Sequence, residues 1–174
     1  WPDAPSKIKH RKILENSFNG LLMNIDNVEV WSRLVGKFNA YNIVAVYATA
    51  LLCGEDKNSV LTVISNIKGA EGRFEYIIND NNIIGIVDYA HTPDALKNVL
   101  STIVEISGRQ GKLITVVGAG GDRDKAKRPI MAEIACSLST NVILSSDNPR
   151  SEDPLMIIED MKKGLDITDK AKTI

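Results

Sequence analysis

Two patterns of apolar and polar residues divide the chain, and the change between them falls near residue 70. Before it, residues 10–16, 18–25 and 28–35 are short segments in which apolar and polar residues alternate, separated by turn-forming residues such as those of NIDNV. Such alternation is typical of half-buried strands, because neighbouring side chains of a strand point to opposite faces. These segments therefore predict a small antiparallel meander.

Two apolar helices are expected to follow the meander. Residues 40–54 are strongly apolar and end at Gly54, a residue type that favours a helix C-terminus. The second helix is expected over residues 59–69, with Asn58 as its N-cap and Gly69 at its end.

From Phe74 onward a strand, a loop and a helix recur three times. Residues 74–90 predict a hairpin with an apolar second arm, followed by a helix with Thr92 as N-cap and Pro93 as its first residue. Two more strands are expected at 112–118 and 141–147, each followed by a helix, at 129–139 and 154–165. Apolar strands that alternate with helices predict an α/β fold, in which a parallel sheet is covered on both faces through right-handed crossovers.

Polar residues gather where the three predicted strands end, in DYAHTPD (88–94), GAGGDRDKAKR (118–128) and SDNPRSED (146–153). The carboxyl ends of parallel strands share one edge of a sheet, where ligands of open α/β proteins bind. This placement predicts a site that contains Asp88, His91, Arg123 and Arg150. The alternative is ordinary polar surface, since Asp, Asn, Pro and Gly are common turn residues.

The glycine-rich stretch VVGAGGDRDKAKRP (116–129) does not match the common phosphate-binding loops. It lacks the G-x-x-x-x-G-K-[ST] pattern, and Gly118, Gly120 and Gly121 do not fit G-x-G-x-x-G. Its glycines would still let backbone N–H groups approach a ligand, and the Arg123 guanidinium suits a carboxylate or a phosphate. The alternative is a surface Arg123 in salt bridges with its charged neighbours.

Asp88 and His91 each have more than one interpretation. Asp88 ends a strand and suits a ribose hydroxyl or an Mg²⁺-bound water, and its alternative role is to cap a helix. His91 is a candidate general base, with capping or stacking as the alternative. The other histidine is His10, in the meander, so no metal site on protein ligands is expected. No Ser or Cys has a histidine at a spacing that suggests a catalytic triad.

Composition narrows the classes of function. The 174 residues are 44% hydrophobic and 25% charged, as in ordinary globular proteins. The net charge of -1 does not indicate the excess of basic residues that is typical of proteins that bind nucleic acids. No apolar run approaches the roughly 20 residues that span a bilayer, and the first residues do not resemble a signal peptide. Cys53 and Cys136 are expected to be buried free thiols, which suits a reducing cytoplasm.

Five motifs in order resemble the Mur ligases, over essentially the whole chain. VDYAHTPDAL, GAGGDRDKAKRPIM and SSDNPRSEDP resemble the C-terminal domain of that family, and GKFNAYNIVAVYA and EGRFE resemble the end of its central domain and the hinge. The resemblance implies that residues 1–70 end an α/β central ATP-binding domain. It implies that residues 71–174 form most of the C-terminal domain, a Rossmann-like three-layer sandwich with a mostly parallel sheet.

The resemblance implies an ATP- and Mg²⁺-dependent amide ligase of cytoplasmic peptidoglycan synthesis. ATP phosphorylates a substrate carboxyl group, and the amine of the incoming amino acid attacks the acyl phosphate. The match is best to the members that add meso-diaminopimelate to UDP-N-acetylmuramoyl-L-alanyl-D-glutamate, with no nucleic-acid or membrane partner. When the roles of the family's residues are transferred motif by motif, the resemblance implies that the nucleotide is contacted by Asn39, Asn42, Arg73, Asp88 and His91.

An amino-acid pocket is implied at Arg123, Asp147, Asn148 and Arg150. Arg150 would meet the far carboxylate that diaminopimelate has and lysine lacks. An arginine facing the lysine ammonium would be repulsive, so the motif disfavours a lysine-adding relative.

Several family features are not in this sequence: the phosphate-binding GKT loop, the UDP-sugar domain, the modified lysine that binds Mg²⁺ and a later GKGHE-like segment. The sequence therefore resembles a part of a longer ligase, with no catalytic residue and no metal ligand assigned. We expect it to release no phosphate above background with ATP, diaminopimelate and the UDP-dipeptide. One alternative is a related ligase of the folylpolyglutamate or cyanophycin synthetase type, which would not be expected to carry DNPR. The other is a non-catalytic module that binds a nucleotide or an amino acid.

Overall fold

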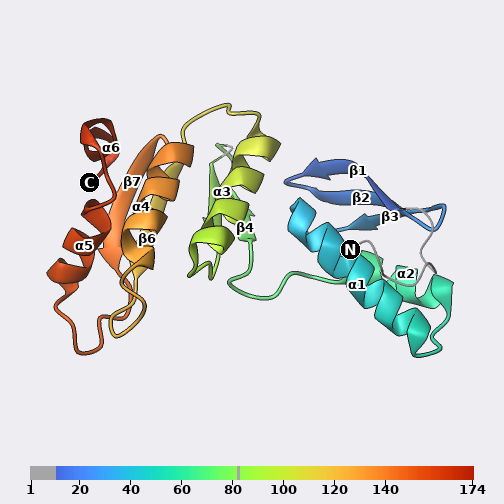
Figure 1. Cartoon of the computed structure of the whole chain (residues 1–174). Coiled ribbons are helices and arrows are strands. Elements are labelled where there is room, and N and C mark those ends of the chain that lie inside the picture. Colours follow the sequence, from blue (N-terminus) through green and yellow to red (C-terminus); the bar gives the residue numbers. More distant parts are fainter. Residues whose placement is uncertain (1–10, 82) are drawn as a thin grey trace. The chain divides into compact units, whose positions relative to one another are not determined.

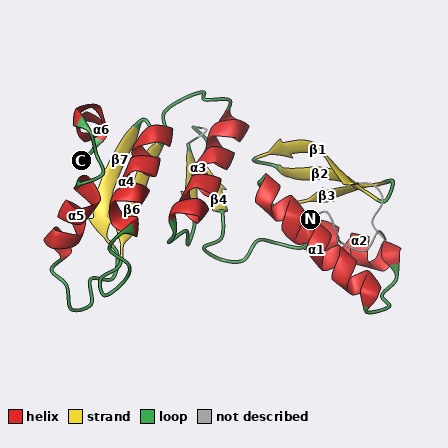
Figure 2. Cartoon of the chain, in the orientation of Figure 1, coloured by secondary structure: helices red, strands yellow, loops and turns green. Residues whose placement is uncertain are grey.

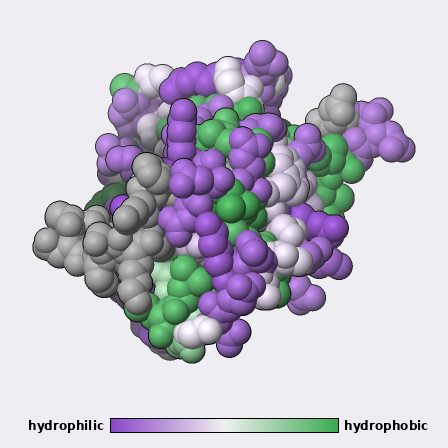
Figure 3. Space-filling view, turned by 90° about the vertical axis from the view of Figure 1, so that its right-hand side faces the viewer, coloured by the Kyte–Doolittle hydropathy of each residue, from purple (hydrophilic) through white to green (hydrophobic). Residues whose placement is uncertain are grey.

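The computed structural model describes residues 11–81 and 83–174 and shows a mixture of helices and strands (Figures 1 and 2). Contacts group the chain into two compact units, divided between Tyr89 and Ala90. Hydrophilic residues make up much of the face in Figure 3, with smaller hydrophobic areas between them. Among the described residues, no helix has the length and apolar character needed to cross a bilayer.

The first unit begins with the predicted antiparallel meander, in the order β1 (Arg11–Ser17), β2 (Gly20–Ile25) and β3 (Val28–Ser32). The turn between β2 and β3 consists of Asp26 and Asn27, whose φ angles of 49° and 65° match the tight turns that favour Asp and Asn. The meander is therefore confirmed, while His10 lies outside the described residues.

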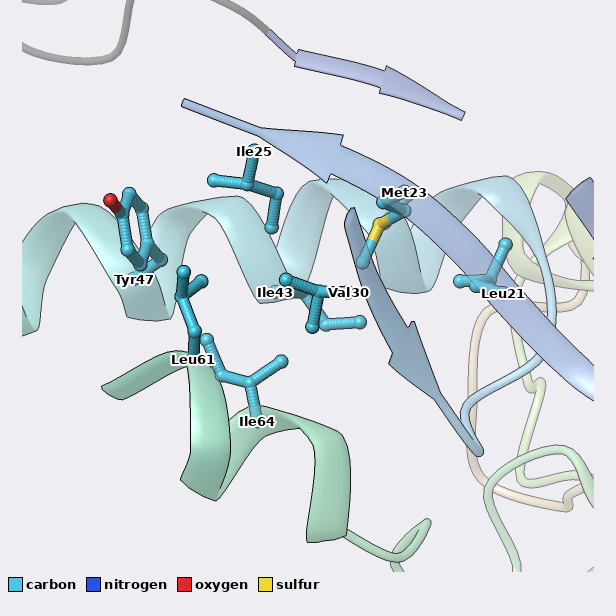
Figure 4. Close-up of a cluster of buried hydrophobic side chains, with 9 residues drawn as sticks. Leu21, Met23, Ile25, Val30, Ile43, Tyr47, Leu61 and Ile64 are labelled. Atoms are coloured by element: carbon cyan, nitrogen blue, oxygen red, sulfur yellow. The ribbon is translucent and has the colours of Figure 1, made fainter. Parts of the chain in front are cut away.

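Helices α1 (Lys37–Leu52) and α2 (Lys57–Asn66) pack with the meander around an apolar core (Figure 4). That core contains Leu21, Met23, Ile25, Val30, Ala40, Ile43, Tyr47, Leu61 and Ile64. Two details of the sequence prediction were wrong. Helix α2 is capped by Asp56, whose side chain accepts from Ser59 N, so the N-cap lies two residues before Asn58. The helix also ends at Asn66, before Gly69.

Cys53 is exposed, whereas Cys136 is buried as expected. Cys53 follows the last turn of α1 as its C-cap, where the chain leaves the core. The apolar run that precedes it indicated burial of the helix, but burial is confined to the face that carries Ala40, Ile43 and Tyr47.

Tyr47 is a buried hydrogen-bond donor in this core, and it predicts an alkaline limit to stability. Its hydroxyl donates to Asp26 Oδ2 over 3.0 Å, and burial together with this bond raises the pKa of Tyr47 from 10.0 to about 12. The neutral phenol therefore stabilises the fold below about pH 10, and we expect that contribution to disappear as the pH rises from about 10 through about 12.

Denaturant titrations across this pH range test the expectation. Tyr47→Phe should lose the part of the alkaline decline that belongs to this hydroxyl, whereas Tyr41→Phe, at a residue 73% exposed, should keep it. An alkaline decline identical in the wild-type chain and the Tyr47→Phe variant would contradict the assignment.

The predicted hairpin is also confirmed, with β4 (Glu75–Ile78) antiparallel to β5 (Ile84–Val87). The residue before β4, Phe74, is 5% exposed and has a φ angle of 46°, which is unfavourable for a bulky side chain. Its ring lies 5.8 Å from that of Phe38, between centroids, so apolar packing holds this conformation.

The second unit contains α3 (Pro93–Ser107), β6 (Ile114–Ala119), α4 (Lys127–Leu138), β7 (Asn141–Ser146), α5 (Pro154–Lys162) and α6 (Ile167–Lys172). Thr92 caps α3 and Pro93 begins it, as predicted. Strands β6 and β7 are parallel, and α4 and α5 each contact both of them. Helix α6 was not predicted, because its six residues, ITDKAK, have no apolar period.

The parallel sheet differs from the prediction in two respects. Among the strands of the described residues, only β6 and β7 pair in parallel, and β5 pairs with β4. Strand β7 also forms backbone hydrogen bonds with Ile174. The apolar run before Asp88 suits a hairpin arm as well as a central strand, so its pattern did not distinguish the two. In addition, Ile114 and Val116 of β6 are 61% and 67% exposed, so described residues do not cover this face of the strand.

Candidate functional site

Two of the three predicted polar loops lie side by side at the carboxyl ends of β6 and β7. The parallel register places Ala119 opposite Ser146, so the segments that follow both strands leave the sheet together. Asp147 N donates to Ala119 O over 3.1 Å, and Gly121 N donates to Asn148 O over 2.8 Å. The edge of the sheet therefore brings residues 118–128 and 146–153 together, whereas Asp88, of the third predicted loop, belongs to the first unit.

Gly121 allows the two loops to touch through their backbones. A Cβ atom at this position would lie 1.8 Å from Pro149 O and 2.6 Å from Pro149 C. Its N–H is already bonded to Asn148 O. The hypothesis that this glycine lets a backbone N–H approach a ligand was therefore wrong for Gly121, which serves close packing between the loops.

Asp122 forms hydrogen bonds between the two loops, next to the contact of Gly121 with Pro149. Its carboxylate accepts from Ser151 Oγ over 2.7 and 2.9 Å and from Ser151 N over 3.2 Å. Its own N–H donates to Glu152 Oε1 over 2.7 Å. The hydrogen bonds from Ser151 lower the pKa of Asp122, so the carboxylate stays charged and bonded near neutral pH.

Arg150 and Arg123 both lie next to Gly120. A Cβ atom at Gly120 would lie 3.0 Å from Arg150 Nη1 and 3.7 Å from Arg123 Cγ. Arg150 Nη1 donates to Gly121 O over 2.8 Å, and Asn148 Oδ1 accepts from Arg150 N over 3.2 Å. The Arg150 backbone has a φ angle of 51°, a conformation that these contacts hold.

Both of these arginines have unused hydrogen-bond donors. Within the described part of the chain, Arg150 Nε and Nη2 donate no hydrogen bond, and Arg123 is exposed with neither an ion pair nor a hydrogen bond. The salt-bridged alternative for Arg123 is therefore wrong. Asp147 and Asn148 are exposed beside them, so the site offers cationic and anionic groups to one ligand.

The buried Arg128 is the residue of this region that the sequence reasoning missed. Its side chain is 1% exposed, in the first turn of α4. Nη2 donates to Glu152 Oε1 over 2.8 Å and to Gly120 O over 3.1 Å, while Nη1 donates to Glu152 Oε2 over 3.0 Å and to Asp160 Oδ2 over 2.8 Å. One guanidinium therefore joins both loops to α4 and α5.

A signal for Arg128 was present in the sequence. It precedes Met131, Ala132 and Ala135 by three, four and seven residues, which is the spacing of one helix face, and all three are buried. A cation on the apolar face of a helix requires buried partners. Glu152 and Asp160, which supply them, are 24 and 32 residues away, too far for any local pattern to indicate.

Four residues predicted to contact a nucleotide lie in the first unit. Asn39 Nδ2 donates to Val35 O over 2.8 Å, and Asn42 Nδ2 donates to Asn39 Oδ1 over 3.3 Å, so both asparagines share one side of the start of α1. Phe38, next to Asn39, contacts Phe74. The start of α1 therefore adjoins the base of the hairpin.

The hairpin brings Arg73 and Asp88 close together, because Glu75 pairs with Val87. Asp88 Oδ2 accepts from Phe74 N over 2.8 Å, and the Arg73 guanidinium carbon lies 4.8 Å from the centroid of the Tyr89 ring. A cation over an aromatic face is attracted to it, so Tyr89 holds Arg73 in place.

His91, the fifth predicted nucleotide contact, belongs to the second unit. It is exposed and lies immediately before Thr92, the N-cap of α3. Over residues 11–81 and 83–174, no cluster of three or more His, Cys, Asp or Glu side chains could hold a metal ion. No residue is therefore assigned to Mg²⁺.

Comparison with known proteins supports the family that the motifs indicated. Residues 72–174, more than half of the chain, match the family described as Mur ligase, glutamate ligase domain. A UDP-N-acetylmuramoyl-L-alanyl-D-glutamate--2,6-diaminopimelate ligase of Cytophaga hutchinsonii is 56% identical over 163 residues, which are 94% of this chain and 33% of the relative. The chain thus spans about one third of the length of the curated relatives that it matches.

Solved structures confirm the α/β fold class. A UDP-N-acetylmuramoyl-L-alanyl-D-glutamate--2,6-diaminopimelate ligase has 39% identity and a TM-score of 0.57, over 92% of this chain and 33% of that chain. A folylpolyglutamate synthase from Thermotoga maritima has a TM-score of 0.68 at 16% identity, over 94% of this chain and 38% of that chain. The second likeness concerns the fold alone, because one fold can carry different functions.

Proposed function

The chain belongs to the Mur ligase family, and we propose that it is part of an ATP-dependent amide ligase that adds meso-diaminopimelate to UDP-N-acetylmuramoyl-L-alanyl-D-glutamate in the cytoplasm. The name of the Cytophaga hutchinsonii relative supports this substrate pair. In this proposal residues 1–70 end the central domain, and residues 71–174 belong to the domain that binds the amino acid. The family match, which begins at residue 72, supports that boundary.

One observation carries the choice of amino acid: Arg123 and Arg150 both lie next to Gly120, and each has guanidinium donors that are not used within the described residues. Diaminopimelate has a carboxylate at its far end where lysine has none. A guanidinium binds a carboxylate through two parallel N–H···O bonds, and it would repel a lone ammonium. Asp147 and the Asn148 side chain would meet the ammonium groups, for which carboxylate and amide oxygens are suitable acceptors.

The nucleotide is proposed to contact Asn39, Asn42, Arg73, Asp88 and His91. The Asp88 carboxylate, which already accepts from Phe74 N, would also accept from a ribose hydroxyl, and the Arg73 guanidinium would meet phosphate oxygens. ATP supplies the phosphoryl group that activates the substrate carboxylate. The residues of this chain bind and orient the substrates, and no proton transfer is assigned to any of them.

Calorimetric titration of the 174-residue chain tests the amino-acid assignment. We expect meso-diaminopimelate to bind and L-lysine at the same concentration to give no comparable heat. Titration with ATP, in the absence of the amino acid, tests the nucleotide contacts independently. An equal response to both amino acids would remove the support for the pocket and favour a less specific ligand-binding module.

Arg150→Lys is expected to weaken diaminopimelate binding about tenfold or more. Lysine replaces a planar fork with a point charge, so one of two charge-assisted bonds, each contributing about 1.5–3 kcal/mol, is lost. Arg33→Lys, an exposed arginine of the first unit, is the matched control and should leave the affinity unchanged. An Arg150→Lys variant with wild-type affinity would refute the role of the fork.

A further inference from the structure

The buried guanidinium of Arg128 has no role in the proposed ligand contacts, yet its hydrogen bonds converge on three different segments. Two go to Glu152, one to Asp160 of α5 and one to the backbone oxygen of Gly120. The carboxylates have further cationic partners, because Glu152 also pairs with Lys125 over 2.9 Å and Asp160 pairs with Lys163 over 2.6 Å. The cluster is thus an ionic network in which the least exposed member is Arg128.

Through the two loops, this ionic network is connected to the residues of the candidate pocket. Glu152 Oε1 receives the Arg128 Nη2 bond and also the N–H of Asp122, which in turn binds Ser151. Gly120, whose oxygen accepts from Arg128, is also the residue next to which Arg123 and Arg150 both lie. Arg128 is therefore connected to the two exposed arginines through Gly120 and, by way of Glu152, through the contact between the loops.

We propose that Arg128 is a positioning residue for amino-acid recognition. With Glu152 it sets the register of the loop after β6 against the loop after β7, so that Arg150 and Arg123 both lie next to Gly120 with donors free for a carboxylate. This inference rests on the proposed function, because it names what holds the proposed pocket in its binding geometry.

The geometry of its hydrogen bonds gives Arg128 a role beyond stability. A buried ion pair often stabilises a fold no more than apolar residues of the same volume would, so stability alone does not explain a buried arginine here. A guanidinium, however, offers donors in a rigid planar fork, and the Glu152 carboxylate matches two of them. Apolar packing would tolerate sliding of the loops, whereas the fork specifies one register.

The backbone conformations of the two loops have to be held by contacts with neighbouring groups. Asp122 and Arg150 both have φ angles of 51°, a left-handed conformation that aspartate adopts more readily than arginine, and in Arg150 it persists because surrounding contacts impose it. Asp122 is held by Glu152 and Ser151, and Arg150 is held by Gly121 and Asn148. Loosening the Arg128–Glu152 pair should let both residues relax, which would move the Arg150 guanidinium away from Gly120.

Glu152→Gln and Arg128→Lys in the 174-residue chain test the proposal. The glutamine of the first variant keeps the shape of the side chain but presents an NH₂ group to the guanidinium. The lysine of the second variant keeps the charge but cannot form the fork. We expect both variants to fold, as judged by circular dichroism, and to bind meso-diaminopimelate about tenfold more weakly, the loss that follows when one charge-assisted bond to the ligand is no longer pre-positioned.

A second measurement reads the loops directly. Amide hydrogen exchange at Gly121, Asp122 and Ser151 should become at least about tenfold faster in Glu152→Gln, while exchange in β6 and β7 changes less. Ile157→Val, a buried change in α5, is the control for a general loss of stability, and it should leave both the affinity and the exchange of these three amides unchanged.

The two readouts separate failure of this inference from failure of the proposed function. If the wild-type chain does not bind diaminopimelate, the proposed function fails, and the exchange data still decide whether Arg128 sets the loops. If the wild type binds but Glu152→Gln and Arg128→Lys match it in both affinity and exchange, the positioning role is wrong. If Ile157→Val weakens binding as much as they do, the effect is one of stability, and the inference is overturned as well.

Discussion

Gly121→Ala is expected to destabilise the second unit by about 3 kcal/mol and to abolish diaminopimelate binding. The added Cβ would lie 1.8 Å from Pro149 O and 2.6 Å from Pro149 C, and neither atom belongs to a flexible side chain that could turn away. Overpacking of a well-packed interior typically costs about 1–3 kcal/mol, and a clash with backbone belongs at the upper end of that range. The loops would have to separate, which breaks the bond from Gly121 N to Asn148 O.

Native-state amide exchange of β6 and β7 measures this change, since it reports the second unit separately from the first. Gly85→Ala, followed by exchange in its own hairpin, is the control for an added methyl group: no atom lies within 4 Å of its added Cβ, and its φ angle is not positive. We expect that variant to stay within about 0.5 kcal/mol of the wild type. A Gly121→Ala chain with wild-type protection would show that the loops do not touch as described.

Arg128→Met is expected to lower the free energy of unfolding of the second unit by about 3 kcal/mol. Removal of one partner from a buried ion pair costs about 3–5 kcal/mol, because the remaining charge stays in the interior without compensation. The lower end applies here, since the Glu152 and Asp160 side chains retain 14% and 19% exposure and Lys125 and Lys163 remain beside them. Lys125→Met, which removes an exposed partner of the same carboxylate, should cost under about 1 kcal/mol.

Acid dependence gives a second test of the same cluster. Hydrogen bonds from Arg128 first, and then Lys125, hold the pKa of Glu152 well below its ordinary 4.5, while Lys163 first, and then Arg128, lower the pKa of Asp160. These carboxylates therefore stabilise the fold above about pH 4.5, and that contribution is lost as the pH falls through their lowered values. Arg128→Met should weaken this acid dependence. The role assigned to the buried guanidinium would be contradicted if Arg128→Met lost stability at low pH in the same way as the wild type. It would also be contradicted if Arg128→Met were destabilised no more than Lys125→Met.

Local patterns predicted most elements of the fold but not their ends or their pairing. The meander, the hairpin and the capping of α3 by Thr92 followed from alternation and from a Thr-Pro pair, which act through neighbouring residues. The cap of α2 was placed two residues late, because Asp56 and Asn58 are both suitable residue types and only the backbone conformation chooses between them. The hairpin partner of β5 was predicted, but its expected place in the parallel sheet was wrong, since an apolar run of that length suits a hairpin and a parallel sheet equally well.

By itself, the sequence determined the family, the alternation of strands and helices in the second unit, and the residue types of the candidate pocket, because motifs and periodicity are properties of short stretches. Only the tertiary structure decided what each loop residue does. It showed Gly121 to be a backbone contact, Arg150 to be held by Gly121 O with donors left over, and Arg128 to be buried between two carboxylates. These roles depend on groups 24 to 32 residues apart, and their burial and charge pairing exist only after the chain has folded.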